Sequence, residues 1–373
     1  MTTRVWSWLM LPIGLLLAGC PDDGGGGLGS EGTGAVAPAR LYVANQGSDN
    51  VSGYTYDRGT GALTPIPGLP VAAGDVPFAI RVSPDGSLVY VANLFDGNVS
   101  AYSADSATGA LTQVTGSPFA IAAGFGLAMS PNGRFLFIPG NGGNNVGAYT
   151  INQTTGALTA VTGSPFGAGN GPRAAVVSRS GAYLFVANES SDNVSAYTLN
   201  ASTGVLTAVT GSPFAAGDQP MDVTISPDGR FLYVTNHNVD NVSAYAINQS
   251  TGELTSVTGS PFSTGDQPFM VTVSPNGAFL FVTNFNSANI SVFTINSGSG
   301  ALAAVAGSPF ATGTSPSGVT TSADGAFLYV ANQGSGNIST FAINPTTGAL
   351  TAITGSPFGA GGGPTGIGIP GRP

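Results

Sequence analysis

The sequence has very little charge, and it contains no lysine. Charged residues make up 7% of the 373 positions, all nine basic residues are arginines, and the net charge is −9. Proteins that bind nucleic acid through its phosphates need a basic surface that displaces counterions. This chain cannot present such a surface, so nucleic acid is excluded as a partner.

Cysteine occurs only once, as Cys20. A single cysteine excludes an intrachain disulfide, a CxxC redox pair and a zinc site built from cysteines. The loop acids Asp75, Asp218 and Asp266 recur singly and not in the alternating run that is typical of a calcium loop. We therefore expect neither a metal site nor a cofactor.

The N-terminus has the pattern of a bacterial lipoprotein signal peptide. Arg4 is the only charge before an apolar run over residues 5–17, which is too short to span a bilayer stably. The run ends in Leu-Ala-Gly-Cys, which is similar to a lipobox. We therefore expect residues 1–19 to be removed and Cys20 to carry a lipid that anchors the exported protein to the cell envelope, on its periplasmic or its surface face. The glycine-rich residues 20–39 are expected to form a flexible tether.

From residue 40 onward one unit of 47 or 48 residues recurs seven times. Each unit has a block like Tyr-Val-Ala-Asn followed by one like Asn-Val-Ser, and six units also contain Gly-Ser-Pro-Phe. A period in this range is typical of propellers and solenoids. The marker asparagine is found at Asn45, Asn93, Asn188, Asn236, Asn284 and Asn332, with Gly140 in its place in the third unit.

Each unit contains four short strand patterns separated by turn residues. In the fifth unit these patterns cover residues 221–226, 230–235, 242–247 and 254–258. Four antiparallel strands per unit, without any helical periodicity, predict an all-β, seven-bladed β-propeller over residues 40–373. We expect it to be a monomer.

The two ends of the repeat region predict how the ring closes. The first unit begins at its second strand pattern, over residues 41–44, and the last unit is followed by an extra first-strand pattern over residues 363–370. We therefore expect the C-terminal strand to complete the first blade, which takes three strands from one end of the chain and one from the other. Such closure removes exposed sheet edges.

The repeated Tyr-Val-Ala/Thr-Asn and Ser-Pro-Asp/Asn-Gly blocks resemble those of the YVTN-type and lactonase-type seven-bladed propellers, which include 6-phosphogluconolactonase-like proteins. The resemblance covers essentially all of residues 40–370. It implies a site on the face where the first strand of each blade begins and the second ends, which we call the top face. It also implies that Arg173, in Gly-Pro-Arg, and Glu189, in Val-Ala-Asn-Glu, match site residues of that family, and that Asp222 has a match in the next blade.

The resemblance also reveals departures from the family pattern. Phe125 occupies the position of a family histidine, and Phe269 occupies that of a further arginine. The resemblance therefore implies an incomplete site, in which Phe125, Phe269 and Asp222 would contact a ligand.

Two positions of the repeat vary while the rest stays constant, and both lie at the top face. Because the rest of the repeat is constant, this variation indicates that function and not packing determines the residues at these two positions. The position after the repeat proline holds Phe78, Phe125, Arg173, Met221, Phe269, Ser317 and Thr365. The position after the marker asparagine holds Gln46, Leu94, Asn141, Glu189, His237, Phe285 and Gln333.

Three of these variable residues are candidates for catalysis. Arg173 can polarise a carbonyl or clamp a carboxylate, and Glu189 or His237 can act as a general base. The alternative is that Arg173 and Glu189 form a structural ion pair and that His237 is an exposed loop residue.

Other polar residues receive simpler interpretations. Arg134 and Arg230 follow turns on the opposite, bottom face and are expected to be solvated. Arg81 lies in an inner strand and is expected to project into the central channel. The Asn-X-Ser/Thr sequences are expected to be turn asparagines in the left-handed conformation and not glycosylation sites. They begin at Asn50, Asn98, Asn193, Asn241, Asn289 and Asn337, among others.

Two function classes remain open. In the first, the protein is a non-catalytic envelope module whose top face binds a small molecule or a protein. In the second, it is a lactone hydrolase with an incomplete family site. A sugar-binding role is the weakest of the alternatives, because both tryptophans precede Cys20 and would leave with the signal peptide.

Overall fold

The structure is a computed structural model that describes residues 39–121 and 124–371. The expected signal peptide, Cys20 and the tether up to residue 38 lie outside these described residues. No helix in the described part of the chain is both long enough and apolar enough to cross a membrane.

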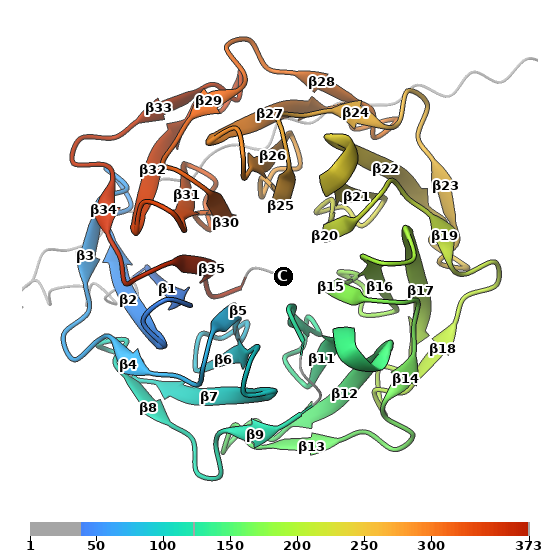
Figure 1. Cartoon of the computed structure of the whole chain (residues 1–373), viewed down its shortest axis with the longest axis horizontal. Helices are drawn as coiled ribbons and strands as arrows, with labels where there is room; N and C mark the ends of the chain where they lie inside the picture. The colour runs from blue at the N-terminus through green and yellow to red at the C-terminus, as the bar shows by residue number, and fades with distance from the viewer. Residues whose placement is uncertain (1–38, 122–123, 372–373) are drawn as a thin grey trace, which may run out of the picture. The chain divides into compact units, whose positions relative to one another are not determined.

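The described residues from 39 onward form seven antiparallel sheets arranged around a central channel (Figure 1). These sheets are the blades of a β-propeller, so the predicted fold class is confirmed. The innermost strands are β5 (Pro77–Val82), β10 (Ala128–Met129), β15 (Pro172–Val177), β20 (Pro220–Ile225), β25 (Pro268–Val273), β30 (Pro316–Thr321) and β35 (Pro364–Gly368).

The third strand of each blade is the longest, and it pairs with the second strand without a register shift, as in β16 with β17 and β21 with β22. The second strands are β1 (Arg40–Asn45), β6 (Leu88–Asn93), β11 (Phe135–Gly140), β16 (Tyr183–Asn188), β21 (Phe231–Asn236), β26 (Phe279–Asn284) and β31 (Phe327–Asn332). The third strands are β2 (Asn50–Tyr56), β7 (Asn98–Ala104), β12 (Asn145–Ile151), β17 (Asn193–Leu199), β22 (Asn241–Ile247), β27 (Asn289–Ile295) and β32 (Asn337–Ile343). Two short 3-10 turns, η1 (Asn141–Gly143) and η2 (His237–Val239), follow β11 and β21.

The fourth strand of every blade is divided into two short segments, whereas the sequence predicted one strand. In six blades the serine of Gly-Ser-Pro-Phe lies at the break, where its Oγ accepts a hydrogen bond from a third-strand N–H, as Ser260 does from Ala244 (2.9 Å). The first blade is divided in the same way although Leu69 replaces the serine. The first segments are β3 (Leu63–Pro65), β8 (Leu111–Gln113), β13 (Leu158–Ala160), β18 (Leu206–Ala208), β23 (Leu254–Ser256), β28 (Leu302–Ala304) and β33 (Leu350–Ala352). The second segments are β4 (Val71–Ala72), β9 (Phe119–Ala120), β14 (Phe166–Gly167), β19 (Phe214–Ala215), β24 (Phe262–Ser263), β29 (Phe310–Ala311) and β34 (Phe358–Gly359).

The hydrophobic core lies between neighbouring blades. Successive side chains of a strand point to opposite faces of its sheet. In β16, Phe185 therefore packs against the fifth blade, while Leu184 and Val186 pack against the third. Both faces of each sheet are thus buried, which explains why the second strands are almost entirely apolar.

The ring closes as the sequence predicts. Strand β35 pairs with β1, so that Tyr42 lies opposite Gly368 and Val43 opposite Ile367. The Thr365 hydroxyl donates to the carbonyl oxygens of the first and second blades, including that of Phe78 at 2.9 Å. Strands from the two ends of the repeat region therefore share one sheet, β3-β2-β1-β35.

The asparagines of the Asn-X-Ser sequences adopt a different role from the one expected. In the fifth blade Asn241 begins β22, and the residue in the left-handed conformation is its predecessor, Asp240 (φ 51°). The buried marker residue Asn236 donates to Asn241 Oδ1 (2.7 Å) and to Ser243 Oγ (2.8 Å). The same pair of bonds recurs in six blades, so these asparagines stabilise the start of the third strand.

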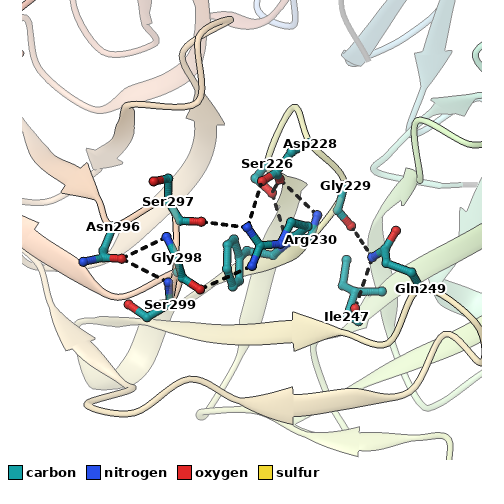
Figure 2. A network of polar contacts seen from close by, with 12 residues as sticks. Ser226, Asp228, Gly229, Arg230, Ile247, Gln249, Asn296, Ser297, Gly298 and Ser299 are labelled. Carbon is teal, nitrogen blue, oxygen red and sulfur yellow. Dashed lines mark hydrogen bonds and ion pairs between the residues drawn. The ribbon is translucent and has the colours of Figure 1, made fainter. Parts of the chain in front are cut away.

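Arg230, which the sequence analysis took to be solvated, joins two blades. Figure 2 shows its guanidinium reaching the turn of the sixth blade, where it donates to Ser297 O (2.9 Å) and Gly298 O (3.3 Å). Its carboxylate neighbour Asp228 lies at 3.9 Å, and the ring of Phe231 lies beneath it. Arg230 and Arg134 are both exposed, as expected, and the long side chain of Arg230 in addition spans the gap between two blades.

Candidate functional site

The top face brings Arg173 and Glu189 together. Arg173 is the second residue of β15, and Glu189 follows the last residue of β16. A β-bulge after Pro172 shifts the register between these strands, and bulges commonly redirect a side chain. Arg173 Nη1 lies 3.0 Å from Glu189 Oε2, and the two side chains are only 11% and 19% exposed. The two residues thus share the top face as expected, and they form the ion pair that the sequence analysis gave as the alternative to catalysis.

Three phenylalanine rings enclose the guanidinium of Arg173. The Cζ atom lies 4.1 Å from the ring centre of Phe125, 5.5 Å from that of Phe269 and 5.7 Å from that of Phe78. Distances below about 6 Å allow the cation to be attracted by the faces of aromatic rings. We call these three rings with Arg173 the aromatic cage.

The cage includes residues of three blades other than the fourth. Phe78, Phe125 and Phe269 occupy the same repeat position as Arg173, so they project toward the same part of the channel. Phe78 also contacts the other two rings, with centroid distances of 5.3 Å to Phe125 and 6.2 Å to Phe269. Burial in this cage lowers the pKa of Arg173, and the charge and hydrogen bond of Glu189 oppose that effect.

His237 lies at the edge of the cage. Its ring centre is 6.1 Å from that of Phe269, and its Nδ1 lies 3.3 Å from the carbonyl oxygen of Pro268. Half-burial lowers the pKa of His237, which favours the neutral imidazole at pH 7. No hydrogen bond in the described part of the chain joins His237 to Arg173 or Glu189, so its link to the pair is through Phe269.

Asp222 lies inside the channel, in the same cavity as Arg173. Its Oδ2 accepts a hydrogen bond from the N–H of Val271 in the next blade (3.0 Å). Burial raises the pKa of Asp222, while this bond and the charges of Arg81 and Arg173 act in the opposite direction. The cavity has a volume of about 120 Å³ and is lined by Phe78, Phe125, Arg173, Asp222 and Phe269, among others.

Phe78 is the one cage residue that the sequence analysis did not single out. The signal was present, because Phe78, Phe125 and Phe269 share a position in the repeat. At the same repeat position, the seventh blade has Ser317 and the first blade has Thr365 in place of an aromatic residue. Ser317 and Thr365 direct their hydroxyls to backbone carbonyls of neighbouring strands, as in the 3.0 Å bond from Ser317 to Pro364 O.

In the described residues, no three His, Cys, Asp or Glu side chains gather closely enough to hold a metal ion. The groups that the site offers for chemistry are the Arg173–Glu189 pair, the partly buried carboxyl of Asp222 and the imidazole of His237. These groups could bind a polar group of a ligand whose remaining surface contacts the phenylalanines.

The model of one protein family, described as a seven-bladed lactonase β-propeller, matches residues 35–218, 127–311 and 306–362. The chain belongs to this lactonase family. A comparison with curated proteins gives no match.

Solved structures agree with a lactonase-family fold. A candidate 6-phosphogluconolactonase from Bacteroides uniformis superposes with a TM-score of 0.78 at 21% identity, over 90% of this chain and 100% of its own. The periplasmic gluconolactonase of Pseudomonas aeruginosa superposes with a TM-score of 0.75 at 23% identity, over 89% of this chain and 98% of its own. At such identities the likeness is one of fold.

Proposed function

We propose that this lactonase-family propeller is a lipid-anchored protein of the bacterial cell envelope that binds a small molecule at its top face without chemical turnover. The observation that carries the proposal is the enclosure of Arg173. Glu189 and three phenylalanine rings surround its guanidinium, so the group that would polarise a substrate carbonyl is already engaged.

The surroundings of the pair favour binding over proton transfer. Phe125 and Phe269 occupy the positions where the family resemblance implies a histidine and an arginine, and neither ring can transfer a proton. A positioned acid or base typically contributes about 10²–10⁴-fold in rate. The cage instead offers apolar surface, which suits a ligand with an apolar face and one polar group.

A second candidate function is lactone hydrolysis, and the Arg173–Glu189 pair favours it. Family membership makes it reasonable, and a periplasmic gluconolactonase is among the proteins of similar fold. In this case a substrate carbonyl would have to draw Arg173 away from Glu189, and the freed carboxylate or His237 would then activate water. A neutral lactone suits the site better than a phosphorylated one, because Glu189 already offsets the charge of Arg173.

The two functions can be separated with a panel of neutral and phosphorylated five- and six-membered lactones. We expect no turnover above buffer for the wild type, for Arg173→Ala or for Glu189→Gln. Calorimetry on the same panel should find ligands whose affinity falls about ten-fold or more in Phe125→Ser and Phe269→Ser. Serine is chosen because it occupies this position in the seventh blade as Ser317. Arg134→Ala, on the bottom face, is the matched control.

Turnover that both Arg173→Ala and Glu189→Gln abolish would replace the binding proposal with lactone hydrolysis. Binding that is equal in the wild type and in both phenylalanine variants would place the ligand site elsewhere.

The anchor is tested separately through Cys20. Cys20→Ser removes the thiol that would accept the lipid, so we expect the variant to move from the membrane fraction to the soluble fraction while keeping its melting temperature. A variant that stays with the membrane and remains folded would contradict lipidation at Cys20.

A further inference from the structure

Two large apolar side chains are exposed in the part of the chain that the structure describes, Phe95 (73%) and Val239 (44%). Phe95 lies in the loop between β6 and β7, and Val239 is the last residue of η2, between β21 and β22. Both segments follow the top end of a second strand. The two exposed apolar side chains therefore lie on the same face of the propeller, outside the aromatic cage.

The repeat requires neither of these side chains. The other six blades have small or polar residues at both positions, so the fold forms without an apolar residue there. The positions equivalent to Phe95 hold Gly47, Gly142, Ser190, Asn238, Asn286 and Gly334. The positions equivalent to Val239 hold Ser48, Asp96, Gly143, Ser191, Ser287 and Ser335.

Phe95 is presented by a loop that hydrogen bonds hold in place, between two exposed aspartates. The N–H of Phe95 donates to the carbonyl oxygen of Asp75 (3.3 Å). The N–H of Asp75 in turn donates to Asp96 Oδ2 (2.9 Å). Asp75 and Asp96 are both exposed. We call Phe95 with Asp75 and Asp96 the first rim site.

Val239 has similar surroundings three blades further along the ring (Figure 1). Its neighbour Asn238 donates from Nδ2 to Asp218 Oδ2 (3.4 Å). Asp240, the next residue, accepts a hydrogen bond at Oδ1 from the N–H of Gln267 (2.8 Å). Asp218 and Asp240 are both exposed. We call Val239 with Asp218 and Asp240 the second rim site.

The aromatic surface of the channel extends toward the second rim site. His237, which shares η2 with Val239, lies 6.1 Å from Phe269 between ring centres. Phe269 also contacts Phe285, at 5.4 Å, and Phe285 is partly exposed. An apolar surface bordered by polar residues is typical of an interaction site.

The exposed charges of the top face have one sign. The seven exposed aspartates there are Asp49, Asp75, Asp96, Asp192, Asp218, Asp240 and Asp266, and no ion pair of the described residues involves them. The exposed arginines of the described residues all lie at bottom-face turns: Arg58, Arg134, Arg179 and Arg230. A partner of complementary charge is therefore a cation.

We propose that the two rim sites dock a cationic segment of a partner protein. Arginine or lysine side chains of that segment would lay their aliphatic stems on Phe95 and Val239 and direct their charged ends to the flanking aspartates. Long basic side chains combine an apolar stem with a charged end, and the face of a phenylalanine ring attracts a cation.

The arrangement favours a polypeptide over the other possible occupants. The rim sites lie in the second and fifth blades, so a small cation can fill only one of them, whereas a polypeptide segment can reach both (Figure 1). Anionic lipids and the same face of a second copy are repelled by exposed aspartates. The proposal concerns the loops around the channel mouth and does not depend on the function proposed for the aromatic cage.

The test uses the purified full-length chain and a short fluorescent peptide in which arginine alternates with leucine. Fluorescence anisotropy measures its dissociation constant. We expect the peptide to bind at low ionic strength and to bind more weakly as sodium chloride is added, because the contacts are partly electrostatic. A peptide in which glutamate replaces each arginine should not bind.

The variants at the rim sites use residues that the repeat itself provides. Phe95→Ser copies Ser190, and Val239→Ser copies Ser191. Together these two changes should weaken binding about ten-fold, because they remove the apolar contacts. Asp75→Asn with Asp218→Asn copies Asn170 at both positions and should weaken it about five-fold.

A matched control removes the same number of charges from the bottom face. Asp228→Asn with Asp324→Asn copies Asn132 and Asn276, and both aspartates are exposed. This double variant should bind the peptide within about two-fold of the wild type. Phe95→Ser leaves the aromatic cage complete, so it should give the same result as the wild type with the panel of lactones, whichever function the cage has.

Four results would overturn the proposal. The first is a wild type that does not bind the peptide. The second is equal weakening in the rim and bottom-face aspartate variants, which would indicate general attraction to an acidic protein. The third is binding that needs the rim aspartates but not Phe95 and Val239. The fourth is adsorption of the Cys20→Ser form to phosphatidylcholine vesicles, or its self-association in sedimentation, that Phe95→Ser abolishes, since the occupant would then be a lipid surface or a second copy.

Discussion

Arg173 and Phe185 lie in the same blade, but their positions differ in how much the residue varies from blade to blade. Phe185 points between blades, is fully buried, and has an aromatic counterpart, Phe or Tyr, in each of the other six blades. Arg173 points toward the channel, where its counterparts are three phenylalanines, a methionine, a serine and a threonine. A side chain between blades always meets the same kind of neighbour, so its identity is fixed by packing. At the channel the corresponding position differs among the blades, so packing against a constant neighbour does not fix the residue there.

The largest loss of stability is expected when the contacts that close the ring are removed. Deletion of residues 363–373 removes β35 and leaves β1 with an unpaired edge. It also removes the buried side chains of Ile367 and Ile369. We expect a loss of about 5 kcal/mol or more in the free energy of unfolding. Thermal or urea unfolding will measure it, and an unchanged midpoint would contradict closure by this strand.

Substitutions in the core between blades should cause the next largest loss of stability. Phe185→Ala leaves a cavity in a core where Phe185 is completely buried, so we expect a loss of about 3–5 kcal/mol. Phe269→Ser at the channel should cost no more than about 1–2 kcal/mol, because Phe269 is only partly buried. Urea unfolding of the two variants compares the regions directly. Equal losses of unfolding free energy in the two variants would show that the aromatic cage contributes to stability as the hydrophobic core does.

The Arg173–Glu189 pair should have a smaller but measurable effect. Glu189→Gln keeps the shape of the side chain and leaves a largely buried cation without its counter-charge, so we expect a loss of about 2 kcal/mol. The double variant with Arg173→Met should recover part of that loss, because the cage then encloses an apolar side chain. A double variant that is less stable than Glu189→Gln alone would contradict this account of the pair.

The sequence predicted the features that repeat. Seven copies of four strand patterns, and the split between the first unit and the C-terminal strand, determine the ring and its closure. It also predicted the Arg173–Glu189 pair, because adjacent strands of one blade bring residues sixteen positions apart to the same end. These contacts are local to one blade or to the two ends of the repeat, so a period and a turn pattern are enough to predict them.

The sequence could not predict contacts across the channel. The cage requires Phe78, Phe125 and Phe269 of three blades to lean over one guanidinium, and that depends on the tilt and radius of the ring. The 3.0 Å bond from Val271 to Asp222 likewise joins two blades. The bonds of Arg230 to the sixth blade were not predicted for the same reason, because its partners belong to the next blade.

The smallest expected effect concerns Asp222 and depends on pH. Burial raises the pKa of Asp222, so between the unfolded and folded values the folded state holds a proton that the unfolded state has released. The carboxyl therefore contributes stability below its unfolded pKa of 3.8, and this contribution is lost as the pH rises through the folded value. Asp222→Asn keeps an acceptor for the N–H of Val271 but cannot ionise.

At pH 7 the Asp222→Asn variant should accordingly be more stable than the wild type, because the raised pKa makes ionisation of the folded carboxyl unfavourable. The advantage should shrink as the pH falls toward 4, because the wild-type carboxyl then becomes neutral as well. Urea unfolding of both proteins across this range measures the trend. Asp228→Asn, at an exposed turn on the bottom face, serves as the control for general effects of charge. If the advantage of Asp222→Asn grew as the pH fell, the charges of Arg81 and Arg173 would outweigh burial, and Asp222 would be an ionised partner of the two arginines.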